Sequence, residues 1–387
     1  MILGDSITEQ RQYSTLVESY VLSRFPTWDV TFRNTGWGGD TMHLHTRGGL
    51  DKGFVRDLQP LHATAVTIAF GMNDARSGER GYNSYLANAK TLVGKFTAEG
   101  ARVALVSPSS EERYEIGQPA GSAYNLMLRK YSEGLQAVAQ ENGVRFVDQL
   151  EPMVEAIESG RKSGHLSRDP DGTRLVPDGV HPNWEGAFLM ATSLLKGLNA
   201  PELVSRIELD AASGQARTER TKLSDLQIKE SLSFIRLDDS LPWPVPPEAL
   251  PAAKIPGFTP FADLSRYELK VTNLSAPRYQ VAVDGSPIGL FTKEELASGV
   301  NLSAEAMAAL PECGELLAAI KAKNDLFYAL WRGVKVPIIP EWIPKEAVEQ
   351  ARAEKVQEME AKLEAAEAAL LRLRLPKPHQ WTLTPVS

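Results

Sequence analysis

The sequence contains one cysteine, Cys313, among 387 residues. A single cysteine excludes a disulfide framework within the chain and any zinc site built from several cysteines. Basic residues are not in excess either, because 42 Lys and Arg stand against 49 Asp and Glu, which gives a net charge of −7. The chain therefore lacks the electrostatic signature of a protein that binds nucleic acid or an anionic membrane surface.

Long apolar segments are also missing. No apolar run approaches the roughly 20 residues that a membrane-spanning helix requires. No signal peptide is present, and the strand-like start Met1-Ile2-Leu3 is short against a usual strand of about five residues. We therefore expect the natural protein to begin further upstream. Its localisation stays open, with the periplasm and secretion among the alternatives.

Cofactor motifs are absent as well. The chain has no Gly-rich phosphate loop with a Lys and no dinucleotide fingerprint, which argues against a nucleotide cofactor. His43 and His45 lack a third ligand at a suitable spacing, so we expect no metal site. The protein is predicted to work without a cofactor.

Residues 1–200 alternate strand-like and helix-like segments. The apolar, β-branched runs that predict strands are 29–32, 65–70, 102–106 and 144–147. The helical patterns between them are 14–24, 82–99 and 124–142. Because this alternation with short connections builds a parallel sheet covered by helices, we predict an α/β domain over residues 1–200.

The pattern changes near residue 200. Strand-like segments then follow one another without helices, and Asp284-Gly285 is typical of a hairpin turn. We predict a small, sandwich-like all-β module over residues 201–300, interrupted by a Pro-rich crossing at 242–260. The region 301–387 is predicted to be helical.

A long helix is predicted at 345–375, after Pro344 and before Pro376. Its apolar residues follow the spacing of a coiled-coil seam. They are Val356, Met359, Leu363, Ala366, Leu370 and Leu373. Two arrangements remain open for this seam, packing against the same chain or a homodimer.

A candidate nucleophile stands near the start of the chain. Ser6 follows the first short strand in the stretch GDSIT, and open α/β sheets carry their chemistry at the carboxyl ends of strands. Taken alone, Asp5 and Ser6 fit equally well as caps of the next helix.

A candidate base occurs in the loop before the last helix of the first domain. In the stretch DGVHP, Asp178 and His181 lie three residues apart. Asp178 can then face Nδ1 of the imidazole while Nε2 faces a nucleophile. The alternative is that both residues cap a turn and the helix that follows.

Two further stretches, NTGWGGDT at 34–41 and GMND at 71–74, follow predicted strands. Glycine lets a backbone N–H approach a ligand closely, and the Asn73 amide can donate to an oxyanion. Each stretch is common alone. All four, however, lie at strand ends or in the loop before a helix, and in a doubly wound sheet such ends converge on one crevice.

In this order the stretches GDSIT, NTGWGGDT, GMND and DGVHP resemble the SGNH (GDSL) hydrolase superfamily. The resemblance implies a three-layer α/β/α fold of flavodoxin-like type, with Ser6 as nucleophile, His181 as base and Asp178 as the third triad member. It also implies an oxyanion hole made of the Ser6 N–H, the Gly39 N–H and the Asn73 amide. It ends near residue 200. The Gly-x-Ser-x-Gly elbow of α/β-hydrolases is absent.

The four stretches and the resemblance predict a serine esterase that hydrolyses a short acyl ester through an acyl-serine, with an acetylated carbohydrate as the preferred substrate class. A long apolar lid is missing from the first domain, which disfavours long-chain lipid. Candidate substrate-binding residues near the four stretches are Trp37, Arg47, Arg76 and Trp184, and core or surface roles fit them as well. Two alternatives remain: an acyltransferase with the same site, and a non-catalytic carbohydrate-binding or scaffold protein.

Overall fold

The computed structural model describes residues 1–112, 122–169, 171–337 and 342–386. Four short strands form one parallel sheet in the N-terminal domain, in the order β1-β2-β3-β4. They are β1 (Ile2–Gly4), β2 (Ala65–Ala69), β3 (Arg102–Val106) and β4 (Arg145–Val147). Gly4, Ala69 and Val106 pair at the carboxyl ends of neighbouring strands. The loops that follow β1 and β2 are therefore adjacent.

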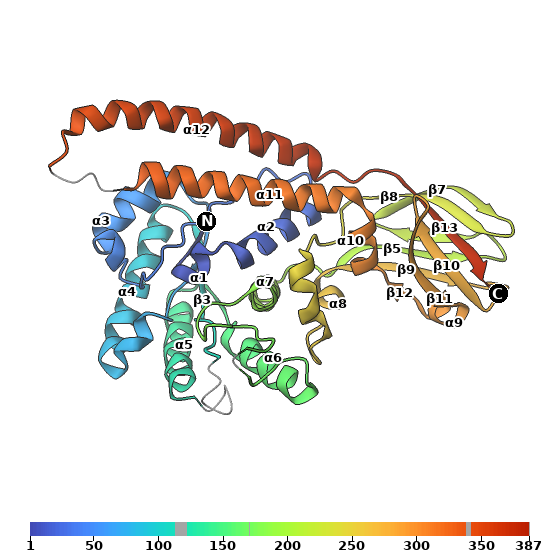
Figure 1. Cartoon of the computed structure of the whole chain (residues 1–387), viewed down its shortest axis with the longest axis horizontal. Coiled ribbons are helices and arrows are strands. Elements are labelled where there is room, and N and C mark those ends of the chain that lie inside the picture. Colours follow the sequence, from blue (N-terminus) through green and yellow to red (C-terminus); the bar gives the residue numbers. More distant parts are fainter. Residues whose placement is uncertain (113–121, 170, 338–341, 387) are drawn as a thin grey trace.

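Helices cover both faces of this sheet. Their bounds are α1 (Ser6–Glu9), α2 (Gln12–Arg24), α3 (Leu50–Gly53), α4 (Glu79–Ala98), α5 (Ala123–Glu141), α6 (Leu150–Ser163) and α7 (Trp184–Gly197). Helices α2 and α7 pack together, α4 and α5 pack together, and the two pairs lie on opposite sides of the sheet (Figure 1). The predicted α/β/α fold is confirmed.

The segment 29–32, predicted as a strand, is not one. The chain meets β1 only at a bridge between Ile2 and Asn34, where the Ile2 N–H donates to Arg33 O at 2.8 Å. Val30 and Phe32 instead face a cleft of about 240 Å³ next to the C-terminal helix. Their apolar side chains pack at that contact rather than inside the sheet.

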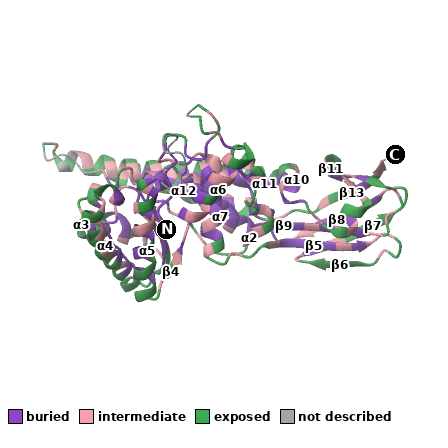
Figure 2. Ribbon diagram, turned by 90° about the horizontal axis from the view of Figure 1, so that it is seen from below, coloured by how far each residue is buried: buried purple, intermediate pink, exposed green. Residues whose placement is uncertain are grey.

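Two sheets form the β module. The first has the order β12-β9-β5-β6 and the second β11-β10-β13-β8-β7. Their strands are β5 (Leu203–Asp210), β6 (Ala216–Glu219), β7 (Thr221–Ile228), β8 (Leu232–Asp238), β9 (Arg266–Thr272), β10 (Arg278–Val283), β11 (Ser286–Thr292), β12 (Val300–Asn301) and β13 (His379–Val386). Tyr267 of one sheet contacts Trp381 of the other, with 5.9 Å between ring centroids. Figure 2 shows the buried positions inside the module and the exposed edge strand β6.

Strand β13 overturns the prediction that residues 301–387 are helical throughout. It pairs with β10 on one side and β8 on the other. Trp381 and Leu383 alternate with more exposed neighbours and are completely buried. The end of the chain thus supplies a central strand whose apolar face completes the core of the sandwich.

The Pro-rich crossing docks the module on the N-terminal domain. It contains the 3₁₀ helix Pro247–Lys254 and α8 (Pro260–Leu264). Trp243 is fully buried, and its indole N–H donates to Leu16 O of α2 at 2.9 Å. Its ring packs edge-on against Tyr20 of α2 and Phe188 of α7. The crossing is therefore an anchor as well as a linker.

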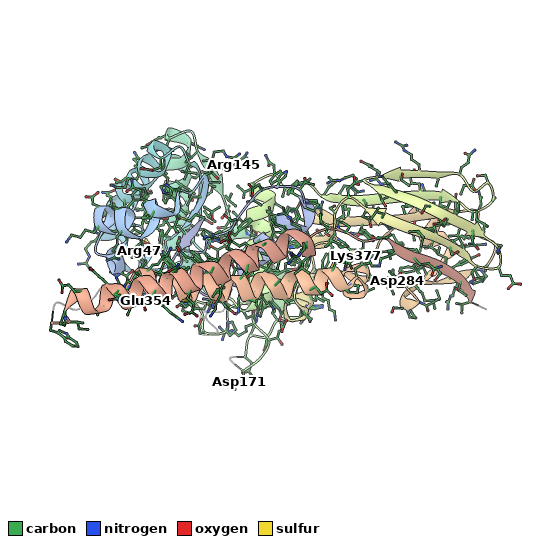
Figure 3. The ribbon with its side chains drawn as sticks, turned by 90° about the horizontal axis from the view of Figure 1, so that it is seen from above. Arg47, Arg145, Asp171, Asp284, Glu354 and Lys377 are labelled. Carbon is green, nitrogen blue, oxygen red and sulfur yellow. The ribbon has the colours of Figure 1, made fainter. Side chains whose placement is uncertain are left out.

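The remaining helices are α9 (Lys293–Ser298), α10 (Ser303–Ala309), α11 (Pro311–Leu330) with a π-helical extension (Trp331–Lys335), and α12 (Lys345–Leu373). Helices α11 and α12 run side by side from the β module to the N-terminal domain (Figures 1 and 3). Met359 and Leu363 of the predicted seam are buried in a cluster with Phe327 and Trp331. Since α11 of the same chain covers these seam residues, a homodimer would have to use another surface.

An ion pair fixes α11 to the N-terminal domain. Lys323 Nζ lies 2.7 Å from Glu18 of α2, and both side chains are almost completely buried. Asn324 also donates to Glu18 at 2.9 Å.

Within the described ranges, no helix combines the length and apolar character needed to cross a bilayer.

Candidate active site

The turn from β1 into α1 presents Ser6. A Cβ on Gly4 would lie 2.1 Å from Thr8 Oγ1 and 2.7 Å from Ala69 O, so only glycine fits there. Asp5 caps α1, with its carboxylate accepting the Ile7 N–H at 3.0 Å. Ser6 is then the first helical residue, and its own N–H has no partner within the helix.

The predicted triad residues are brought together. Ser6 Oγ lies 2.7 Å from His181 Nε2, and His181 Nδ1 lies 2.7 Å from Asp178 Oδ2. The other oxygen of Asp178 accepts the backbone N–H groups of Val180 at 2.9 Å and His181 at 2.7 Å. Asp178 thus orients both the imidazole and the turn that carries it.

Hydrogen bonding keeps Asp178 ionised. Partial burial acts to raise the pKa of this carboxyl, but the backbone and imidazole of His181 and the Val180 N–H together lower it. An ionised Asp178 favours the imidazole tautomer whose Nδ1 carries the proton and whose Nε2 accepts one from Ser6.

The predicted oxyanion donors come from three segments: Ser6 follows β1, Gly39 follows the bridge between Ile2 and Asn34, and Asn73 follows β2. The Gly38 N–H is occupied, because it donates to Glu9 Oε2 at 2.7 Å. Gly39 is exposed and has a φ of +74°, and in the described part of the chain its N–H donates to no other group. Asn73 Nδ2 donates one hydrogen to Asp40 O at 2.9 Å, which leaves its second hydrogen for a ligand. This pattern favours Gly39 over Gly38.

Two carboxyl groups beside the site have perturbed pKa values. Burial raises the pKa of Asp5 to about 7, with Asp40 adding to the effect and the Ile7 N–H and His181 opposing it. Burial likewise raises the pKa of Asp74 to about 7, helped by Asp5 and Asp40 and opposed by the Met42 N–H. Near neutral pH both groups are partly protonated, which limits the negative charge around a developing oxyanion.

Sequence reasoning missed a residue that supports the histidine loop. Glu112 follows β3, is completely buried, and accepts the N–H groups of Leu175 and Val176 at 3.0 and 2.8 Å. Its own N–H donates to Gly179 O at 3.2 Å. Arg161 pairs with its carboxylate at 3.2 Å. The position of Glu112 at a strand end was the one available signal.

The four candidate substrate-binding residues have different surroundings. Arg47 is completely buried and donates to Asp40 and Thr35 O, both at 2.7 Å, so its prediction as a substrate contact is wrong. A buried guanidinium needs an anion, and Asp40 provides it. Arg47 therefore holds the loop of Gly39 in place.

The two tryptophans each meet a cation. Arg332 lies 3.6 Å above the Trp37 ring centroid, and Lys321 lies 4.6 Å from that of Trp184. Both cations come from the C-terminal region. Arg76 is exposed just after Asn73 and hydrogen bonds to Tyr124. Trp184 and Arg76 remain candidates for substrate contact.

The two histidines considered as metal ligands lie apart from the triad. His45 Nδ1 is 3.1 Å from Thr41 Oγ1 and 3.7 Å from Asp40. His43 packs beside Gly49. Among the residues that the structure describes, no three His, Cys, Asp or Glu side chains are grouped so that they could share a metal ion.

The chain was compared with solved structures. The whole chain is similar to BT4096, a gut microbial diltiazem-metabolizing enzyme, with 21% identity, a TM-score of 0.80 and coverage of 100% of this chain and 97% of that chain. Axe2, an acetylxylan esterase from Geobacillus stearothermophilus, is 19% identical over 52% of this chain and 93% of its own, with a TM-score of 0.42. None of the curated proteins matches the chain in sequence. The likeness to BT4096 shows that the N-terminal domain, β module and C-terminal helices occur together in another fold of this type.

The sequence itself matches a family model. Residues 2–187 match the GDSL-like Lipase/Acylhydrolase family, and this range contains all four stretches that carry the predicted site. The predicted resemblance and the predicted enzyme class are confirmed. The N-terminal part of this protein is a carboxylic ester hydrolase domain that belongs to the GDSL-like lipase/acylhydrolase family.

Proposed function

We propose that the protein is a serine esterase that works through an acyl-serine on Ser6. The observation that supports it most is the pair of hydrogen bonds that links Ser6 Oγ to His181 and His181 to Asp178, each 2.7 Å long. A hydroxyl in contact with an imidazole that is itself oriented by a carboxylate is the arrangement needed to activate a serine nucleophile.

The reaction then runs in two halves. Ser6 Oγ attacks the ester carbonyl carbon while its proton passes to His181 Nε2. The carbonyl oxygen becomes an oxyanion that accepts hydrogen bonds from the Ser6 and Gly39 N–H groups and from Asn73. The C–O bond to the alcohol breaks, and the alcohol leaves with the proton from His181. Water then attacks the acyl-serine while its proton passes to His181. The bond to Ser6 Oγ breaks, the serine takes back the proton, and the acid is released.

We further propose that the acyl group is short. The cavity lined by Asp5 and Ile7, the two neighbours of Ser6, and by Met72 and Pro108 among others, but not by Ser6 itself, has a volume of about 10 Å³. Such a space holds about one water molecule and no acyl chain. Two of the candidate aromatic residues have a cation against the ring, Lys321 on Trp184 and Arg332 on Trp37. They suit a polar leaving group, and an acetylated carbohydrate is our preferred class.

A panel of p-nitrophenyl esters from acetyl to octanoyl, together with acetylated sugars, tests this proposal. We expect kcat/KM to fall by at least tenfold from acetyl to octanoyl, and mass spectrometry of quenched enzyme to show the acyl group on Ser6. Faster hydrolysis of octanoyl esters would contradict the short acyl group. Acylation at another residue would contradict the mechanism.

The acyltransferase alternative uses the same acyl-serine and is separated by adding a sugar acceptor. An esterase releases free acid at an unchanged rate when the acceptor is present. Formation of an acylated sugar faster than free acid would replace hydrolysis by transfer. Absence of turnover on every ester would favour the non-catalytic alternative.

A further inference from the structure

Helix α11 places a row of polar side chains against the catalytic elements. Tyr328 and Arg332 lie four residues apart on one face of α11 and its π-helical extension. Tyr328 contacts Glu9 of α1, and Arg332 contacts Glu9 and Trp37. Figure 1 shows α11 crossing over α1 and α2. The C-terminal region therefore forms one wall beside the predicted oxyanion hole.

Glu9 is the residue through which this wall reaches the site. It ends the helical turn that Ser6 begins. Its Oε2 accepts the Gly38 N–H at 2.7 Å, and its Oε1 accepts the Tyr328 hydroxyl at 3.0 Å. Arg332 Nε lies 3.6 Å from the same Oε1, an ion-pair distance.

Gly38 is shaped to accept this contact. A Cβ on Gly38 would lie 2.8 Å from Glu9 Oε2 and 4.0 Å from Ser6 Cβ, so the bare Cα passes close to both side chains. The following residue is Gly39, the predicted oxyanion donor. A bond that fixes the Gly38 amide consequently fixes the peptide next to the donor.

The neighbouring Trp37 is held from the same side. Its ring lies under the Arg332 guanidinium at 3.6 Å and meets the edge of Trp331 at 6.1 Å. The backbone N–H of Trp37 donates to Gly4 O at 3.0 Å. Beyond the hole, Arg47 and Asn73 hold Asp40. Gly39 is the exposed tip of a loop that is clamped on both sides.

We propose that Glu9 is a positioning residue for the oxyanion hole, and that Tyr328 and Arg332 of the C-terminal region hold Glu9 in place. This inference rests on the proposed serine-esterase function. Glu9 contacts no reacting atom. It takes up the Gly38 N–H, orients the Gly39 N–H, and couples the C-terminal helices to the rate of acylation.

The charge of Glu9 explains why two partners are needed. A free carboxylate beside the oxyanion hole would repel the negative charge that develops in the transition state. The Tyr328 hydroxyl and the Arg332 guanidinium compensate that charge on the side away from Gly38. Preorganised donors work only when they are held in place, and a displacement of about 1 Å can lower a rate by about 10²-fold.

The test compares Glu9→Ala, Glu9→Gln, Tyr328→Phe and the control Asp325→Ala, with acetyl ester hydrolysis and inhibition by an aryl boronic acid as readouts. Boron bonds to Ser6 Oγ, the serine proton passes to His181, and the tetrahedral adduct places an oxygen in the hole. Asp325 suits as the control because it lies on the same helix, its side chain is 70% exposed, and its ion pair is with Arg11 rather than with Glu9.

We expect Glu9→Ala to lower kcat by about 10- to 100-fold with KM changed less than about threefold, and to weaken boronate binding in parallel. Glu9→Gln should retain kcat within about fivefold because its amide oxygen still accepts the Gly38 N–H. Tyr328→Phe should cost about two- to fivefold. Asp325→Ala should match the parent.

A Glu9→Ala variant with kcat within twofold of the parent would overturn the inference, as would a loss confined to KM or an unchanged boronate affinity. If Glu9→Ala does not fold, Tyr328→Phe and Arg332→Gln decide, and unchanged kcat and boronate affinity in both would overturn it. Ser6→Ala belongs in the same panel. Activity retained in Ser6→Ala would refute the serine-esterase function itself, which is a separate outcome.

Discussion

Two histidines in this molecule each have an aspartate at Nδ1, but the group at Nε2 differs between them. His181 Nδ1 lies 2.7 Å from Asp178, and His379 Nδ1 lies 2.6 Å from Asp284. On the other ring nitrogen, His181 meets the Ser6 hydroxyl at 2.7 Å, whereas His379 meets the Glu312 carboxylate at 3.0 Å. Asp284 lies in the β module, well separated along the long axis of the molecule from Arg47 in the N-terminal domain (Figure 3).

The second partner decides what each imidazole does. A hydroxyl on Nε2 gives His181 a proton to accept, so this residue is suited to act as a base. A carboxylate on each side keeps His379 protonated: the hydrogen bond to Glu312 raises the pKa of His379 to about 9, with Asp284 adding to the rise and burial opposing it. A histidine and an aspartate in contact are therefore not evidence for catalysis until the third group is known.

The comparison predicts that variants will separate into losses of rate and losses of stability. The largest effect is expected at the nucleophile. Ser6→Ala or His181→Ala should lower kcat for acetyl esters by about 10⁴-fold or more, because each removes a member of a cooperating triad. His379→Ala should leave kcat within about twofold at 25 °C. Steady-state kinetics on all three variants checks this, and Ser6→Ala with a tenth of parental activity would remove Ser6 as the nucleophile.

The next largest effect concerns stability alone. Lys323→Met leaves Glu18 charged in a buried site, which should cost about 3–5 kcal/mol of unfolding free energy. Lys335→Ala, which breaks the pair with Glu360 at the exposed end of the π-helical extension, should cost less than about 1 kcal/mol. Urea unfolding followed by fluorescence measures both. Adding Glu18→Gln to Lys323→Met should recover part of the loss, and equal losses in Lys323→Met and Lys335→Ala would contradict the buried ion pair.

The oxyanion donor should give a pure rate effect. Asn73→Ala should lower kcat by about 10²- to 10³-fold with little change in KM, since a hydrogen bond to the oxyanion strengthens only in the transition state. Its melting temperature should stay near that of the parent because the lost bond to Asp40 O is a single contact on a partly exposed loop. A rise in KM with unchanged kcat would assign Asn73 to substrate binding instead.

The sequence was sufficient to predict the triad because each member lies in a short local pattern. Ser6 follows the turn that Gly4 permits, and Asp178 and His181 share one turn, so local spacing accounts for each half of the predicted triad. The contact between Ser6 and His181 joins distant segments and was expected from the way such chain ends converge in a doubly wound sheet. The predicted α/β/α layers follow from alternation for the same reason. These features depend on contacts that are close in sequence or on a fixed rule of chain topology.

What the sequence could not predict depends on contacts between distant segments. Arg47 lies near the catalytic stretches in sequence, but only the structure shows that its guanidinium points into the protein toward Asp40. Strand β13 lies in the region 301–387 that was predicted to be helical, because the strands β8 and β10 with which it pairs are far away in the sequence. Glu9 gains its role from Tyr328, which lies 319 residues later.

The smallest predicted effect is the most diagnostic for the comparison. Below the ordinary histidine pKa of 6.5, His379 is charged in the folded and the unfolded chain, and its two carboxylate contacts contribute fully to stability. Between pH 6.5 and about 9 the folded form keeps a proton that the unfolded form has lost. Stability from this site therefore falls as the pH rises, and it is gone above about 9.

His379→Gln removes this contribution, so the variant should melt about 2 °C below the parent near pH 6, and the gap should close by about pH 10. Differential scanning calorimetry across this range measures the gap, with His165→Gln as the control because His165 is exposed and its ring contacts the neutral Ser163 hydroxyl. A gap that stays constant with pH would mean that His379 stabilises the contact between β13 and α11 by packing alone.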